Sequence, residues 1–273
     1  MAKGEKLVLK DLDKILEQDS LKIISELSSE IKPIMELVKT TKNKSLKISM
    51  INYLVIRLVS TLESYYRNLV RELIDSELFD AKGLLANDEL TISLLELDSI
   101  KQNSKITKGR IIVSNMNFQN LDKINDVISQ ILGGEKFFTR LNKDVDEFEK
   151  MRKIRMLSSS SKRKRTRKRD NTKIFDWQEF RDLVENRHKI IHNMIANKKI
   201  SLDEISNNFN YLFSLIMFTE SEVVKELMTR LKNDLNPQLV IKLKERMARP
   251  QKIYDSISLT VDTKVKKKKR HSK

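Results

Sequence analysis

The sequence predicts an all-α protein, and three observations support this fold class. Only five glycines and three prolines occur among 273 residues, whereas folds built from many short strands need these residues at their turns. Hydrophobic residues make up 39% of the chain and charged residues 34%, a balance typical of amphipathic helices with wet outer faces. Apolar residues also recur at spacings of three and four. A β-sandwich, a β-barrel and a collagen-like chain are therefore disfavoured.

The first predicted helical segment covers residues 7–37. Its apolar residues recur at mixed spacings of three and four, and Pro33 is expected to interrupt the helix. A polar stretch follows at residues 39–45, so we interpret residues 1–45 as an N-terminal helical extension. The apolar positions are Leu12, Ile15, Leu16, Ile23, Ile24, Leu27 and Ile31.

The strongest periodicity lies between Leu54 and Ile74. One continuous apolar stripe there predicts a helix of about 25 to 30 residues that ends before Gly83. Further helices are predicted around residues 89–100, 121–132 and 136–155. The glycine pair at 133–134 is a typical helix C-terminus.

The longest nearly unbroken apolar stretch is residues 211–218. It is well short of the roughly 18 residues that a membrane-spanning helix needs. We interpret it as a segment of a core helix.

The charge balance indicates a polyanionic partner. Fifty-four Lys and Arg against 38 Asp and Glu give a net charge of +16, which favours nucleic acid or an anionic membrane. The chain has no cysteine, so disulfides and thiolate metal sites are excluded. Residues 1–10 hold only a short apolar run, too little for the core of a signal peptide. We therefore expect a cytoplasmic protein.

A dense basic run lies within residues 158–172. Its cations repel one another too strongly to pack, which predicts a disordered basic insertion. Such a run either clamps a phosphate backbone, acts as a nuclear address, or is a solvated insertion that adds only nonspecific affinity. The basic tail 264–273 leaves the same alternatives open. The candidate RNA-binding residues are Lys162, Arg163, Lys164, Arg165, Arg167, Lys168 and Arg169.

The segment 177–195 contains the most informative residues. With successive residues about 100° apart, its apolar residues fall within an arc of roughly 140°, and Arg187 lies near the middle of that arc. A guanidinium on a buried stripe is costly unless carboxylates, carbonyls or a ligand phosphate meet it. His188 and His192 lie one turn apart on the flank of the stripe. The apolar positions are Phe180, Leu183, Val184, Ile190, Ile191, Met194 and Ile195.

Two interpretations of this segment follow from the residues. An arginine that binds phosphate in bidentate fashion, beside imidazoles, is sufficient for metal-free RNA cleavage. Alternatively, Arg187 pairs with a carboxylate at the edge of the core and the two histidines serve as amphipathic packing, which the spacing alone favours. A zinc site is disfavoured because Lys189 stands where HExxH has glutamate. We therefore predict no metal and no cofactor.

The stretch from Arg187 to His192 resembles the Rx4-6H motif of HEPN domains, an all-α superfamily of ribonucleases and nucleotide-binding proteins found in toxins and antiviral systems. The segment 59–73 resembles the first helix of that domain, and together with Leu58 it reads LVSTLESYYRNLVREL. The segment 107–132 resembles the middle of the RiboL-PSP-HEPN branch. Together these resemblances cover residues 46–235, which predicts a HEPN-type helical bundle followed by a C-terminal helix or turn and basic tail at 236–273.

The resemblance also implies roles for individual residues. Arg187 contacts phosphate, His192 is the acid or base, and His188 holds the polar position after the arginine. Glu63 and Asn193 are candidate residues of the cleft, although an ordinary ion pair between Glu63 and Arg67 on a helix surface is the favoured alternative. Tyr65, Tyr66 and Trp177 are expected to serve as packing residues.

The resemblance implies a function as well. We expect a metal-independent endoribonuclease that cleaves RNA by attack of the 2′-hydroxyl, in a toxin or phage-defence setting. HEPN ribonucleases work as dimers whose two motifs share one cleft, so we expect a homodimer that binds RNA, with an antitoxin or regulatory protein as a further partner and no membrane. The alternative is a noncatalytic HEPN module that binds RNA, nucleotide or a partner protein.

Overall fold

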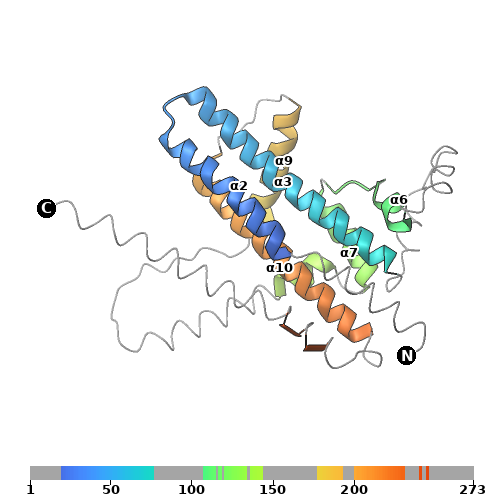
Figure 1. The fold of residues 1–273 in the computed structure, drawn as a ribbon. Helices are drawn as coiled ribbons and strands as arrows, with labels where there is room; N and C mark the ends of the chain where they lie inside the picture. Colours follow the sequence, from blue (N-terminus) through green and yellow to red (C-terminus); the bar gives the residue numbers. More distant parts are fainter. Residues whose placement is uncertain are drawn as a thin grey trace, which may run out of the picture. The chain divides into compact units, whose positions relative to one another are not determined.

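The computed structural model describes residues 20–76, 107–114, 116–118, 120–133, 136–143, 177–192, 200–230, 240–241 and 244–245 (Figure 1). Every regular element within these ranges is a helix, which confirms the predicted all-α fold class. The predicted helix at 89–100, the basic insertion and both chain ends lie outside the described residues.

The described residues divide into two compact units. The first contains the described residues between 20 and 140 together with those between 177 and 216. The second contains residues 141–143 and the described residues from 217 onward. All candidate site residues that the structure describes belong to the first unit.

The first two described helices form an antiparallel hairpin. Helix α2 covers Ser20–Thr40 and helix α3 covers Lys44–Asp75, so only three residues join them (Figure 1). The Asn43 side chain accepts a hydrogen bond from the Leu46 amide and caps the start of α3. Helix α3 includes the whole Leu54–Ile74 stripe, so the long helix predicted there is confirmed.

Pro33 lies inside α2 and does not interrupt it, so that prediction is wrong. A proline within a helix removes one backbone hydrogen bond and costs about 3 kcal/mol. Apolar residues on both sides of it, Ile31 and Val38, are 2% and 0% exposed. Their burial holds the turns before and after the proline in helical conformation.

A polar contact also fixes the hairpin. The Arg57 Nε donates to both carboxylate oxygens of Glu30, each at 2.8 Å, and the Tyr53 hydroxyl donates to the same carboxylate. The hydrogen bond from Tyr53 is the main reason why the pKa of Glu30 lies below its usual value. One acidic residue of α2 thus holds two side chains of α3.

Helix α3 is the common packing partner of the first unit. Helices α2, α6 (Lys108–Ser114), α7 (Leu121–Leu132) and α9 (Trp177–Ile191) all contact it. Of the described helices, α3 alone has the length and apolar content of a membrane span, a test that a core helix also passes. Its buried residues are Leu54, Val55, Leu58, Val59, Thr61, Leu62, Tyr65, Tyr66, Leu69, Val70, Leu73 and Ile74.

The two tyrosines of α3 are buried as predicted. Tyr65 is 3% exposed and Tyr66 is 0% exposed. Their rings meet edge to face, with centroids 5.2 Å apart. The Tyr65 hydroxyl donates to the carbonyl of Ile216, at 3.2 Å, in α10 (Leu202–Arg230).

Two further predictions are confirmed downstream. Helix α7 has the predicted bounds, and Gly133 follows it with a φ of 74°, a left-handed conformation that favours glycine. The core stretch 211–218 lies within α10 and is buried at every position. Helix α10 begins at a capping box, in which Ser201 and Glu204 each accept a hydrogen bond from the other's amide.

Helix α6 packs closely on the C-terminal end of α3 through Gly109. The Asp75 side chain accepts a hydrogen bond from the Gly109 amide at 2.6 Å. A Cβ at position 109 would lie 2.5 Å from the backbone carbonyl oxygen of Arg71. Only glycine allows this approach, because a backbone carbonyl within a helix has little freedom to move.

We expect Gly109→Ala to destabilise the fold by about 1 to 3 kcal/mol, because the added methyl group would force α6 away from α3. Thermal unfolding followed by circular dichroism provides the measurement. Lys108→Ala, at an exposed neighbouring position, is the matched control. Equal melting temperatures for the two variants would contradict the close approach.

Candidate active site

Helix α9 is anchored to the bundle by its first turns. Phe180 is 0% exposed and Leu183 is 2% exposed, and α9 packs on α3. The predicted apolar stripe does not stay buried along the whole helix, because Ile191 is 43% exposed. The last turn of α9 therefore stands clear of the core, and it carries the histidines.

Arg187 faces α3, where its partner is Glu63. The Arg187 Nη2 and the Glu63 Oε1 are 3.4 Å apart, and the two side chains are only 13% and 12% exposed. Neither Arg187 Nε nor Glu63 Oε1 has a hydrogen-bond partner, although both atoms are buried. The contact is thus a charge pair without the bidentate geometry that strengthens an arginine–carboxylate pair.

This arrangement bears on the alternatives for Glu63. The Glu63 side chain is 12% exposed, and its ion pair is with Arg187 of another helix and not with Arg67 of its own helix. The guanidinium carbon of Arg67 instead lies 6.0 Å from the centre of the Phe118 ring. Glu63 is the carboxylate that meets Arg187 at the edge of the core.

The environment of Glu63 makes its carboxyl harder to ionise than that of a free glutamate. Burial raises the pKa of this carboxyl above its usual value, and the positive charges of Arg187 and Arg67 only partly oppose that effect. A buried acid with an incompletely matched cation is a common feature of functional sites. Burial therefore outweighs the ion pair at this position.

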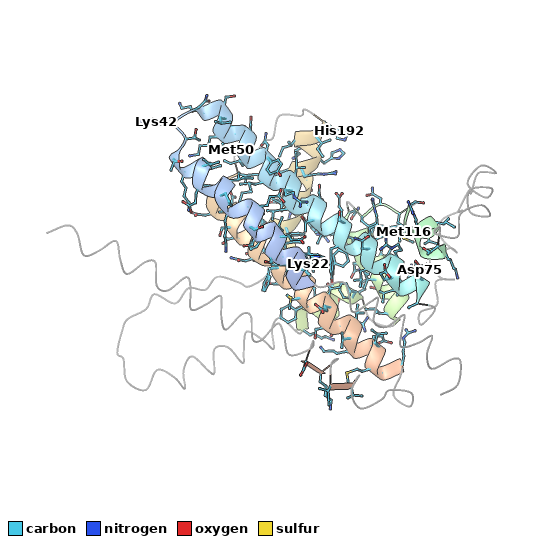
Figure 2. The ribbon with its side chains drawn as sticks, in the orientation of Figure 1. Lys22, Lys42, Met50, Asp75, Met116 and His192 are labelled. Atoms are coloured by element: carbon cyan, nitrogen blue, oxygen red, sulfur yellow. The ribbon has the colours of Figure 1, made fainter. Side chains whose placement is uncertain are left out.

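The two histidines form a second pair on the outer side of α9. Both are exposed, and their ring centroids lie 4.4 Å apart with the ring planes at 53°. Figure 2 shows His192 at the end of α9, where its amide still donates to the carbonyl of His188. Arg187 therefore faces α3, whereas the two imidazoles beside it face outward.

The other predicted site residues lie outside the described part of the chain. These are Asn193 and the seven cations of the basic run. Among the described residues, no three His, Cys, Asp or Glu side chains gather closely enough to hold a metal ion.

The pairing of Glu63 with Arg187 was not predicted from the sequence, yet a signal for it exists. Glu63 follows Val59 by four residues and precedes Tyr66 by three, and both of those residues are buried. A carboxylate at this position borders the apolar stripe, just as Arg187 does on α9. Two oppositely charged residues on two apolar stripes are natural partners.

The motif from Arg187 to His192 lies at the end of one helix of a helical bundle, the setting that the resemblance to HEPN domains implies. A family model described as RiboL-PSP-HEPN matches residues 18–236, so the chain belongs to this family. The predicted resemblance is thereby confirmed, and a nucleotide-related or RNA-related role is supported. The match begins within the segment 1–45 and includes α2. No curated protein and no solved structure matches the chain.

The raised pKa of Glu63 predicts a specific pH dependence of stability. A carboxyl whose pKa is higher in the folded than in the unfolded state stabilises the protein below its unfolded pKa, and this contribution is lost as pH rises through the folded pKa. We therefore expect the wild type to lose stability relative to Glu63→Gln as pH rises from the ordinary glutamate value of about 4.3.

Chemical denaturation at a series of pH values tests this expectation. Glu185→Gln, which changes an exposed carboxyl on α9, is the control. As pH rises, the free energy of unfolding of the wild type should fall relative to that of Glu63→Gln. A difference that is constant with pH, or that moves the other way, would show that Arg187 outweighs burial at this carboxyl.

Proposed function

We propose that this protein is a metal-independent endoribonuclease that cleaves RNA by attack of the ribose 2′-hydroxyl. One observation carries the proposal: the Rx4H segment of α9 presents an exposed pair of histidines beside an arginine that a carboxylate of α3 holds. Membership of the HEPN superfamily, whose domains are often ribonucleases, supports it. The net charge of +16 favours a polyanionic substrate.

The proposed reaction needs one base, one acid and one cation. A neutral imidazole removes the proton from the 2′-hydroxyl, and the 2′-oxygen then attacks the adjacent phosphorus. The bond from phosphorus to the 5′-oxygen breaks, and a protonated imidazole gives its proton to that oxygen. The products are a 2′,3′-cyclic phosphate and a 5′-hydroxyl. His192 is the residue that we assign to proton transfer, with His188 next to it.

Arg187 is the residue that we assign to the phosphate. A guanidinium has five N–H donors, and the Nε of Arg187 has no hydrogen-bond partner. Because the contact with Glu63 lacks hydrogen-bond geometry, a phosphate oxygen that reaches the exposed part of the guanidinium would compete with a charge pair and not with a hydrogen bond. Glu63 then serves as a positioning residue that keeps the cation in place between turnovers.

The orientation of Arg187 also favours a second candidate function. Its side chain is only 13% exposed and faces α3 rather than the outer side that carries the histidines. A noncatalytic module that binds RNA, nucleotide or a protein partner would have this arrangement if the arginine served only to hold α9 on α3. Cleavage activity distinguishes the two functions.

The biological setting that we propose is that of a cytoplasmic toxin or phage-defence effector. An antitoxin or regulatory protein would then restrain the activity. The basic run at 162–169 would add affinity for the RNA backbone. No membrane has a part in this proposal.

We expect the purified protein to cleave RNA in the presence of EDTA, leaving 2′,3′-cyclic phosphate or 3′-phosphate ends and 5′-hydroxyls. Arg187→Ala and His192→Ala should each lower the cleavage rate by about 100-fold or more, the usual contribution of general acid–base catalysis being 10²–10⁴-fold. End-labelled RNA resolved on denaturing gels provides the measurement.

Arg181→Ala is the matched control for this experiment. Arg181 lies on the same helix but is 47% exposed and pairs with Asp122 of α7, at 2.5 Å. This variant should cleave at the wild-type rate. A strict requirement for added Mg²⁺, 5′-phosphate products, or wild-type rates in both active-site variants would refute the assignment.

The family resemblance predicts a dimer with the two motifs at a shared cleft. In such a dimer the two copies of α9 would lie near the two-fold axis. Sedimentation at micromolar concentration should give the mass of a dimer. The exposed Ile191 at the end of α9 offers a site for the test, because Ile191→Glu should weaken a contact made there. A fully active monomer would contradict the shared cleft.

A further inference from the structure

The turn between α2 and α3 carries cations that the proposed catalytic residues do not use. No Asp or Glu occurs between residues 37 and 62, a stretch that holds four lysines and one arginine. The arginine and one lysine pair with carboxylates of α2. The other cations are exposed and make no hydrogen bond or ion pair through their side chains with any described residue. They are Lys42, Lys44 and Lys47.

These lysines lie where α3 extends beyond the packed core. The first buried residue of α3 is Leu54, so the helix has more than two turns before its core begins. With successive residues 100° apart, Lys47 lies about 20° from Leu54 around the helix axis. Ile48, on the same stretch, is 58% exposed. The inner side of α3 is therefore uncovered at its N-terminal end and is cationic there.

The position of the lysines is unfavourable for the isolated chain. The N-terminal end of a helix carries partial positive charge and favours acidic residues. The first turn of α3 holds no acidic residue and begins with Lys44. The three lysines also repel one another, since no carboxylate in the described part of the chain pairs with any of them. An external polyanion would relieve both kinds of repulsion.

We propose that Lys42, Lys44 and Lys47 form a binding surface for the phosphates of single-stranded RNA. We name it the turn surface. The choice of RNA as ligand rests on the proposed function. Figure 2 shows Lys42 and Met50 at the same end of the bundle as His192, so a strand bound at the turn surface would lead toward α9. Lys47 precedes Glu63 by sixteen positions, which corresponds to about 24 Å along α3.

An anionic membrane is the competing ligand, and the surface suits it less well. A helix that binds in a membrane interface needs a broad apolar side, usually with aromatic residues. The exposed large hydrophobic residues near the lysines are Leu37 at the end of α2 and Leu46, Ile48 and Tyr53 on α3. Three aliphatic side chains, and a tyrosine whose hydroxyl is bound to Glu30, provide little area for insertion, whereas three separate cations match a repeating phosphate backbone.

The experiment compares two triple variants in the inactive His192→Ala background. The turn variant is Lys42→Gln, Lys44→Gln and Lys47→Gln. The control variant is Lys22→Gln, Lys108→Gln and Arg110→Gln, which removes three exposed cations whose side chains have no partner among the described residues. Lys22 lies at the other end of α2 from Lys42 (Figure 2), and α6 packs on the far end of α3. Glutamine keeps helix propensity nearly unchanged.

Binding of a fluorescent single-stranded RNA of about 16 nucleotides, the upper site size of common single-strand binders, is measured across a salt series. Each lost phosphate contact lowers the slope of log K against log salt by roughly 0.7. The turn variant should therefore show a slope smaller by about 2, and affinity at about 0.1 M salt should fall at least tenfold. The control variant should bind nearly as well as its parent.

Three results would overturn the turn surface as an RNA site. These are equal affinities for the turn and control variants, an unchanged salt slope in the turn variant, or a loss of binding to phosphatidylserine vesicles with RNA binding intact. Cleavage by the otherwise wild-type protein in EDTA is measured separately. Lysine-dependent RNA binding without cleavage would contradict only the proposed catalysis, and cleavage with equal affinities would contradict only the turn surface.

Discussion

The burial of α3 is the constraint on which the first unit depends. Four helices contact α3, and all of its apolar residues from Leu54 to Ile74 except Ile56 are buried. Three of these neighbours use different kinds of contact: a shared carboxylate on α2, a glycine on α6, and a charge pair on α9. The candidate active site is therefore a consequence of how α9 packs, since Arg187 reaches Glu63 only when Phe180 and Leu183 are buried.

The pair of Glu63 and Arg187 contributes more to orientation than to stability. Two charges that leave water lose hydration, and the attraction between them offsets this loss only when the geometry is good. Here the closest atoms are 3.4 Å apart, and burial still raises the pKa of the carboxyl. The pair holds the guanidinium in a defined place while leaving its Nε without a partner.

The sequence predicted the elements whose signals are long and regular. The stripe of α3 and the glycine after α7 each follow from a repeated spacing or a single conformational requirement. Helix α6 was missed because seven residues give too few turns for a period to appear. The prediction at Pro33 is wrong because the packing of α2 on α3 outweighs the low helix propensity of proline.

The candidate site was predictable in part for a similar reason. Arg187 stands out because a cation on an apolar stripe breaks a local pattern, and the family match covers the segment around it. The partner of Arg187 is far away in sequence, so no local pattern connects it with Glu63. The outward direction of the histidines depends on where the core ends along α9, which the exposed Ile191 marks. Distances of that kind arise only from the packed fold.

The hairpin of α2 and α3 has a consequence for biosynthesis. Its two helices are joined by three residues and can pair as soon as residues 20–76 have left the ribosome. Helix α9 begins only at Trp177, and at about 5 to 20 residues per second its synthesis follows roughly 5 to 20 s later. During that interval α9 does not yet cover the side of α3 on which it packs. The nascent chain therefore exposes apolar surface that a chaperone would recognise, and Arg187 reaches Glu63 only after that interval.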